Sequence, residues 1–223
     1  MNLTRLIETY KRKNKPDRDK MLDYYKGLDP LEKVIEKAAL PIMPDGKRDS
    51  HQRRIKKKVL EKVKDILLDA VNEIDNCHSF EDLIKLVEEK TKEVKRFGEL
   101  AVYDTSLRIS AKKDIYPLKV FLHAGTREGC KVLGLNYKLK VLRVQDFPKP
   151  IRALQPRDIE AFLCIYGNKL YRANGAQRWQ TTDFRAFFKE ALIKLLVRKG
   201  IITEEELLEE IKKINNKKRV RLG

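Results

Sequence analysis

The sequence is poor in the residues that build metal centres and disulfide frameworks. It has three cysteines, Cys77, Cys130 and Cys164, with no CxxC pair among them, and only three histidines. This sparse count excludes a disulfide-stapled secreted domain and leaves no recognisable zinc spacing. We therefore expect no metal, no cofactor and a reducing, cytoplasmic location.

Long apolar runs are also absent. No stretch approaches the roughly 20 apolar residues that cross a bilayer, and residues 1–15 lack the apolar segment of a signal peptide. We expect no membrane association. The sequence contains no internal repeat, no P-loop and no dinucleotide-binding glycine fingerprint, so it does not indicate a nucleotide-cofactor fold.

Charge of one sign is in excess. Lys and Arg number 50 against 33 Asp and Glu, which gives a net charge of +17. A mixed Lys/Glu surface accounts for a high charge density but not for this imbalance. A surplus of positive charge concentrates phosphate polyanions near the surface. Nucleic acid is therefore the predicted class of partner.

Apolar residues recur at helical spacing along most of the chain, between breaks at glycine and proline. The pattern predicts a mainly α fold, with a single helical domain of about nine or ten helices over residues 1–212. A sub-boundary is expected within 138–155, and residues 213–223 form a basic tail. Residues 138–144 alternate between polar and apolar, which indicates one short strand or an extended arm.

The most basic run lies in residues 47–64, which hold nine Lys or Arg and two acids. Apolar residues from Ile55 to Ile74 predict one amphipathic helix of about twenty residues that carries this charge at its N-terminal end. Positive charge there opposes the helix dipole, a cost that a bound phosphate would offset. The candidate phosphate contacts are His51, Arg53, Arg54, Lys56 and Lys57. The alternative interpretation is a solvated face.

A predicted helical hairpin spans residues 79–112. Its first helix is capped by Ser79, with Asp82 three residues later. The pattern breaks at residues 95–101, where Gly98 is expected to adopt a positive φ, and restarts from Leu100 to Lys112. Free amides at the start of the second helix can hold an anion, beside Lys95 and Arg96. The alternative is an ordinary αα-hairpin.

Residues 79–135 resemble the helix-hairpin-helix segment of endonuclease III-type DNA glycosylases. Phe97 and Gly98 correspond to the hydrophobic residue and second glycine of that hairpin, and residues 120–123 lie where the family carries Val-Asp-x-His. The resemblance implies a DNA-clasping element and favours DNA over RNA. The chain departs from the family at three positions: Arg96 replaces the first glycine, Leu100 the lyase lysine and Phe121 the catalytic aspartate. The family's catalytic Lys/Asp pair is therefore missing.

Candidate chemistry gathers at His123 and Arg127, in the glycine-flanked run FLHAGTREG. A helix is expected to start near Thr126, with Thr126 as its cap. His123 can then act as a general base or bind phosphate, and Arg127 can fork onto phosphate or carboxylate. Asp104 and Arg108 stand four apart on one helix and are expected to pair. The alternative is a helix cap with a buried histidine, beside a structural ion pair.

The C-terminal third predicts a helix from Gln155 that stops at Gly167, and then a loop over residues 168–183. Aromatic and arginine side chains of this loop can stack on unpaired bases or pack onto the core; they are Tyr171, Arg172, Arg178 and Trp179. Two further helices are expected, over residues 184–198 and from a capping box at Thr203 and Glu206.

Three hypotheses follow. The leading one is a DNA-binding protein that contacts the phosphate backbone through the Gly98 turn and the basic helix. The second is an enzyme acting on nucleic acid, such as a divergent glycosylase, lyase or nuclease centred on His123, Arg127 and Asp104. The third is a protein-interaction module of a larger complex, in which the charge is incidental.

Overall fold

The fold was analysed in a computed structural model, which describes residues 3–49, 52–173, 203, 205 and 206. The chain divides into two compact units, Met1–Gly175 and Ala176–Gly223, and nearly all of the described residues lie in the first. The predicted helix over residues 184–198, residues 174–183 of the predicted aromatic loop, and His51 lie outside the described residues. Residues 168–173 of that loop, with Tyr171 and Arg172, belong to helix α9 instead. In the second unit, the predicted capping box is present, since the Glu206 amide donates to the Thr203 hydroxyl at 3.2 Å.

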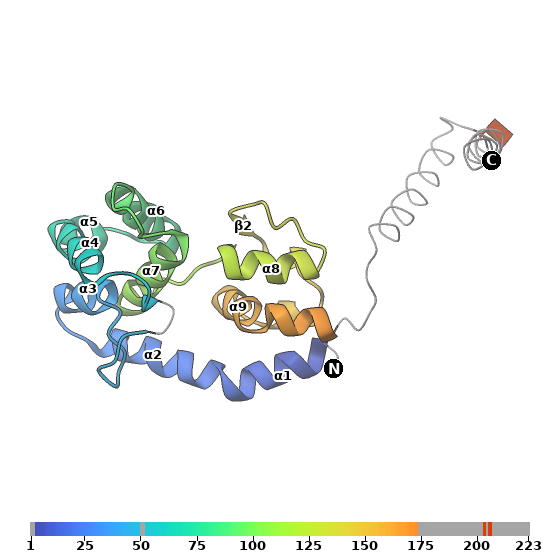
Figure 1. Ribbon diagram of the computed structural model, residues 1–223, viewed down its shortest axis with the longest axis horizontal. Coiled ribbons are helices and arrows are strands. Elements are labelled where there is room, and N and C mark those ends of the chain that lie inside the picture. Colours follow the sequence, from blue (N-terminus) through green and yellow to red (C-terminus); the bar gives the residue numbers. More distant parts are fainter. Residues whose placement is uncertain (1–2, 50–51, 174–202, 204, 207–223) are drawn as a thin grey trace. The chain divides into compact units, whose positions relative to one another are not determined.

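The first unit is mainly helical, as the periodicity predicts (Figure 1). Two-residue strands β1 (Val120–Phe121) and β2 (Val141–Leu142) pair antiparallel, with Val120 opposite Leu142. Two 3₁₀ turns, Val144–Asp146 and Ile151–Ala153, follow β2. The helices are α1 (Leu3–Lys13), α2 (Lys15–Gly27), α3 (Leu31–Ala39), α4 (Lys57–Asp69), α5 (Val71–Asp75), α6 (Phe80–Thr91), α7 (Glu99–Lys113), α8 (Ala124–Val132) and α9 (Pro156–Ala173).

The apolar residues of this unit form two clusters. The first cluster is built by α2 to α7, where residues spaced three and four apart, such as Leu60, Val63 and Leu67, turn inward. The second cluster is built by α1, β1, α8, β2 and α9 around Tyr10 and Phe162. Helices α1 and α2 run one after the other alongside both groups (Figure 1), so α1 packs on α9 and α2 on α7.

The predicted boundaries of the basic helix and of the helix from Gln155 are wrong. The expected twenty-residue basic helix begins only at Lys57 and breaks at Ala70, which separates α4 from α5. Helix α9 does not stop at Gly167 but continues to Ala173. The reason is packing: the missing Gly167 side chain lets α9 approach α8, and an added Cβ would lie 3.3 Å from the Gly129 nitrogen. An added Cβ at Gly129 would likewise meet Leu163 at 3.1 Å.

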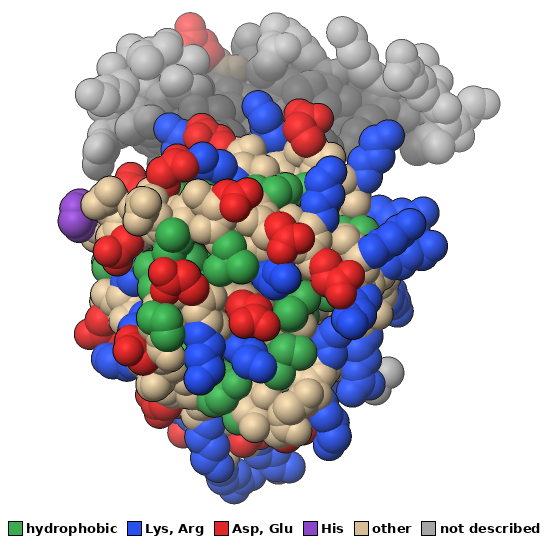
Figure 2. Space-filling model, turned by 90° about the vertical axis from the view of Figure 1, so that its left-hand side faces the viewer, with side chains coloured by type: hydrophobic (Ala, Val, Ile, Leu, Met, Phe, Trp, Pro, Cys, Tyr) green, Lys and Arg blue, Asp and Glu red, His purple; other side chains and the backbone are tan. Residues whose placement is uncertain are grey.

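Charge of both signs covers the face of the molecule on the side of α4 and α5. Figure 2 shows Lys and Arg interspersed with Asp and Glu there, with basic side chains gathered along one edge. In the described part of the chain, no helix combines the length and the apolar composition that a bilayer crossing requires.

Candidate functional site

His123 is the N-cap residue of α8 and only 2% exposed. Strand β1 leads directly into it. The His123 amide donates to the Thr126 hydroxyl at 2.7 Å, and that hydroxyl donates back to the His123 carbonyl at 2.9 Å. The predicted cap is therefore displaced: the helix starts at Ala124, and Thr126 is its third residue. This tight turn fixes the backbone from which the imidazole projects.

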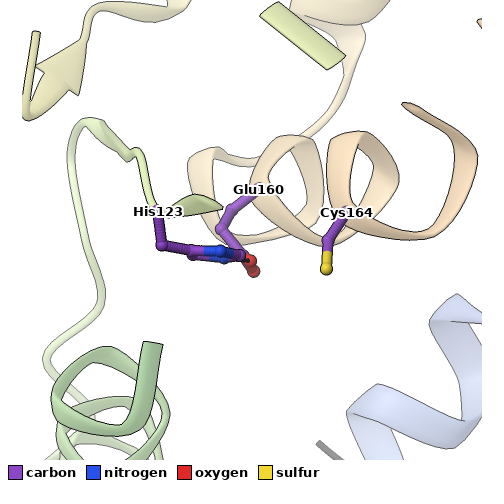
Figure 3. A group of neighbouring side chains, drawn as sticks. All are labelled: His123, Glu160 and Cys164. Carbon is purple, nitrogen blue, oxygen red and sulfur yellow. Dashed lines mark hydrogen bonds and ion pairs between the residues drawn. The ribbon is translucent and has the colours of Figure 1, made fainter. Parts of the chain in front are cut away.

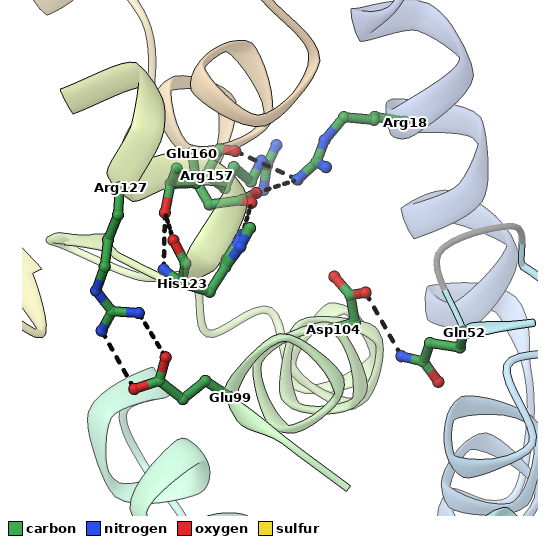
Figure 4. Close-up of polar contacts among 9 residues, drawn as sticks. Arg18, Gln52, Glu99, Asp104, His123, Arg127, Arg157 and Glu160 are labelled. Atoms are coloured by element: carbon green, nitrogen blue, oxygen red, sulfur yellow. Dashed lines mark hydrogen bonds and ion pairs between the residues drawn. The ribbon is translucent and has the colours of Figure 1, made fainter. Parts of the chain in front are cut away.

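The imidazole meets a buried carboxylate from α9. His123 Nε2 lies 2.6 Å from Glu160 Oε1, and both side chains are 3% exposed. The guanidinium of Arg18, on α2, approaches Glu160 Oε2 at 3.5 Å and donates to the Arg157 carbonyl at 3.2 Å (Figure 4). Burial acts to lower the pKa of Arg18, but the surrounding acidic groups, Glu160 foremost, together outweigh it, so the pKa is raised and Arg18 stays protonated.

A second buried carboxylate, Asp158, lies two residues earlier on α9. The Tyr10 hydroxyl donates to Asp158 Oδ1 at 2.8 Å, and Lys15 Nζ lies 3.8 Å from Oδ2. Burial, together with Asp158 and Glu160, raises the pKa of Tyr10 well above its ordinary value. The phenol therefore remains a hydrogen-bond donor to the carboxylate at neutral pH.

Asp104 lies on the α7 side of the same region and is half-buried. Gln52 Nε2 lies 3.5 Å from Asp104 Oδ2 (Figure 4). The predicted pairing with Arg108 is wrong, because the Arg108 guanidinium forms its ion pair with Asp49 and also donates to the Ala38 carbonyl at 3.4 Å. Arg108 is 2% exposed, so it is a structural cation of the first cluster.

The Arg127 guanidinium forms a bidentate salt bridge with a carboxylate of its own chain. Its two terminal nitrogens lie 2.6 and 3.2 Å from the carboxylate oxygens of Glu99, the first residue of α7. The hydrogen bonds from Arg127 lower the pKa of Glu99, and Glu99 raises that of Arg127. Figure 4 shows this pair pointing away from the contact between His123 and Glu160. Of the predicted catalytic trio, the structure brings His123 and Asp104 toward one charged cluster but engages Arg127 elsewhere.

The turn before α7 is open to solvent. Lys95, Arg96 and Gly98 are exposed, whereas Phe97 is buried. The predicted backbone of the turn is wrong in one respect: Arg96 has the positive φ, of 73°, and Gly98 has a φ of −93°. Helix α6 ends at Thr91, before the predicted break at residues 95–101, and α7 begins at Glu99, one residue before the predicted start. Helix α7 starts without a side-chain cap, because its N-cap residue, Gly98, has no side chain that could accept from the first amides.

The basic segment, defined here as residues 53–58, precedes and opens α4. Arg53 and Arg54 lie in the loop, Lys56 is the N-cap of α4, and Lys57 is in its first turn. All four side chains are exposed, as is Lys58. Lys57 pairs with Glu61 at 3.4 Å; among the described residues no ion pair involves the other four.

Two cavities meet at this turn. The first, of about 310 Å³, is lined by Gln52 and Ile55, by residues 98–101 at the start of α7, by residues 123–125 at the start of α8, and by Cys164. The second, of about 480 Å³, has a largely apolar wall that includes Phe97, Tyr103 and Phe121. Gly98, Glu99 and His123 line both.

Sequence reasoning missed Arg18, Gln52, Glu160 and Cys164. One signal was available: Glu160 stands between Ile159 and Ala161 in an otherwise apolar helical stretch, and a charged residue on a buried face requires a partner. The partners themselves come from distant segments. Cys130, by contrast, is fully buried in the second apolar cluster.

Comparison with family models, with curated proteins and with solved structures gives no match to this chain. The helix-hairpin-helix resemblance therefore stays a prediction from the residues of the hairpin.

Proposed function

We propose that this protein binds nucleic acid, DNA in preference to RNA, and contacts the phosphate backbone through the turn before α7 and the basic segment. One observation carries the proposal: Ile55, inside the basic segment, and Gly98, in the turn, line the same cavity of about 310 Å³. Two surfaces predicted independently to contact phosphate thus flank one opening.

The local chemistry of the turn supports this role. The first amides of α7 are directed out of an uncapped helix end, where the helix dipole favours an anion. Lys95 and Arg96 are exposed beside them. The one acidic side chain at this end, Glu99, is neutralised by Arg127 at 2.6 Å, so it offers little repulsion to an incoming phosphate.

The basic segment supplies charge that is not consumed within the fold. Arg53, Arg54, Lys56 and Lys58 are exposed, and they form no ion pair with any described residue. Each such contact with a phosphate releases counterions, so affinity is expected to fall steeply as salt rises.

The test is a salt series of binding to a duplex DNA and to an RNA of matched length, followed by fluorescence anisotropy. The variant Arg53→Gln/Arg54→Gln should weaken binding and lower the slope of log affinity against log salt by about 2. The control is Arg12→Gln/Lys13→Gln, which removes the same charge from exposed positions on α1. No binding at low salt, or an equal loss in both variants, contradicts the proposal.

The contribution of the turn is tested separately. Lys95→Gln/Arg96→Gly removes both exposed cations and is expected to weaken binding at low salt about as much as the basic-segment variant does, because each change removes two phosphate contacts. A binding curve that superimposes on that of the unaltered protein removes the turn from the interface and leaves the basic segment alone.

A second function, an enzyme acting on nucleic acid, is favoured by one observation: His123 lines the same cavity and is oriented by Glu160 at 2.6 Å. A carboxylate that holds an imidazole in one orientation is a common preparation for proton transfer. Abasic, damaged and plain oligonucleotides should be incubated with the protein, with and without magnesium. Cleavage that persists in His123→Ala, with the fold intact, contradicts this assignment.

A further inference from the structure

Two buried carboxylates lie close together on α9. Helix α9 brings Asp158 and Glu160 into the interior, with side chains 2% and 3% exposed. Among the described residues, the partly buried Arg18 is the cation that contacts Glu160, while Lys15 pairs with Asp19 at 2.6 Å and lies 3.8 Å from Asp158. Buried carboxylates require a compensating positive charge, which a bound metal ion can supply.

The same spot holds three different metal-ligating groups. One ligand atom from each of His123, Glu160 and Cys164 lies within 4.8 Å of the other two (Figure 3). Glu160 and Cys164 are four apart on α9 and so share one face of the helix, while His123 reaches them from the start of α8. An imidazole nitrogen, a carboxylate oxygen and a thiolate sulfur are the three ligand types that zinc accepts.

We propose that His123, Glu160 and Cys164 bind one transition-metal ion of the zinc class. The ion takes the place of the proton between His123 Nε2 and Glu160 Oε1, and the Cys164 thiol loses its proton on binding. The contact of Arg18 with the other Glu160 oxygen, at 3.5 Å, holds the carboxylate from behind, which is the role of an outer-shell partner.

The site is accessible on one side. Cys164 is partly exposed, and His123 and Cys164 both line the cavity of about 310 Å³. Three protein ligands with one side open to a cavity is the arrangement of catalytic rather than structural zinc sites, in which the fourth position takes water or a ligand. The site lies beside the turn proposed to hold a phosphodiester, but the metal proposal does not depend on nucleic-acid binding.

The sequence pattern gives no sign of such a metal site. Its ligands lie at positions 123, 160 and 164, and no pair forms the closely spaced Cys or His motif by which zinc sites are recognised. Only the packing of α8 on α9 brings the three together. Hard cations such as magnesium prefer all-oxygen ligands, so zinc and cobalt are the appropriate probes.

The experiment is a competition of the full chain with a chromophoric chelator for Zn²⁺. We expect one ion per chain, bound at least about tenfold more weakly in Cys164→Ser and Glu160→Gln, the scale reached when even outer-shell partners of metal ligands are removed. The matched controls are Cys77→Ser and His78→Ala, which keep the affinity of the unaltered protein because neither residue is part of the cluster.

Cobalt keeps the proposal testable if a variant folds poorly. Co²⁺ bound by the unaltered protein should give a thiolate-to-cobalt charge-transfer band, and Cys164→Ser, with an unchanged circular dichroism spectrum, should remove it. Zinc affinity that is the same in Cys164→Ser and in Cys77→Ser overturns the proposal, as does a cobalt spectrum without a thiolate band. Failure of the DNA salt series would leave these outcomes unaffected, so the two proposals fail separately.

Discussion

Arg108, in the middle of α7, forms an ion pair with Asp49, which lies 59 residues earlier in the chain. The guanidinium is almost fully buried, and Asp49 belongs to the loop between α3 and α4. This contact anchors the loop that leads to Gln52 and the basic segment. The position of the proposed phosphate contacts therefore depends on a cation buried in the first cluster.

Asp49→Ala is expected to destabilise the protein by about 3 kcal/mol, because it leaves the Arg108 charge buried without its partner. This loss is at the lower end of the range for breaking a buried ion pair, because the Asp49 side chain is still 15% exposed. Urea unfolding measures the change. The control, Glu61→Ala, breaks the exposed pair with Lys57 and should cost less than about 1 kcal/mol. Equal losses in the two variants would contradict a buried role for the Asp49 pair.

The pair of Glu99 and Arg127 predicts a pH dependence. Arg127 lowers the pKa of Glu99 in the folded protein, so the pair stabilises the fold above the unfolded pKa of about 4.3 and ceases to do so as the pH falls through the lowered folded value. Arg127→Gln should therefore be less stable at neutral pH, by no more than about 1 kcal/mol since the carboxylate is exposed, and equally stable in strong acid. Denaturant unfolding at both pH values tests this; a gap that persists in acid contradicts it.

Gly98 is predicted to tolerate a side chain. Its φ is −93°, and an added Cβ would have nothing within 4 Å. Gly98→Ala should thus change the free energy of unfolding by less than about 0.5 kcal/mol. Gly134 has a φ of +70° with equally open space, so Gly134→Ala should cost about 1 kcal/mol through backbone strain alone. Thermal unfolding of the two variants compares them, and the reverse order would refute the backbone assignment of the hairpin turn.

Gly129→Ala should destabilise the protein by about 1–3 kcal/mol, because the new Cβ would meet the Leu163 side chain and carbonyl at 3.1 Å. The backbone oxygen cannot move without displacing α9. Gly27→Ala, with nothing within 4 Å, is the control that separates crowding from a general effect of replacing glycine. Differential scanning calorimetry measures both; a Gly129→Ala variant as stable as the control rules out the close helix contact.

Local periodicity predicted most of the helices, because the repeat of apolar residues along an amphipathic helix is visible within a few turns of sequence. The Ser79 cap is an example, since its hydroxyl accepts from the Asp82 amide at 3.1 Å, as its spacing indicates. Boundaries failed where packing between helices decides. Gly167 is a plausible helix stop in isolation, and it becomes a helix interior only because α8 lies against it.

The site was harder to predict because its contacts are tertiary. His123 was found from its glycine-flanked context, but Glu160 lies 37 residues away and Arg18 is on α2. Spacing along one helix suggested Asp104 as the partner of Arg108, yet a residue of another segment, Asp49, reaches the guanidinium. A local pattern can show that a buried charge needs a partner, but it cannot show which residue provides it.

The glycine contact between α8 and α9 has a consequence for selectivity. With backbones this close at Gly129 and Gly167, we expect the two helices to move together, so that His123, Glu160 and Cys164 keep their mutual geometry. Gln52, Ile55 and the start of α7 form the opposite wall of the cavity. The salt bridge from Arg127 to Glu99 joins the edge of this wall to α8. Which molecules fit is therefore set by the gap between two preformed halves rather than by rearrangement within either one.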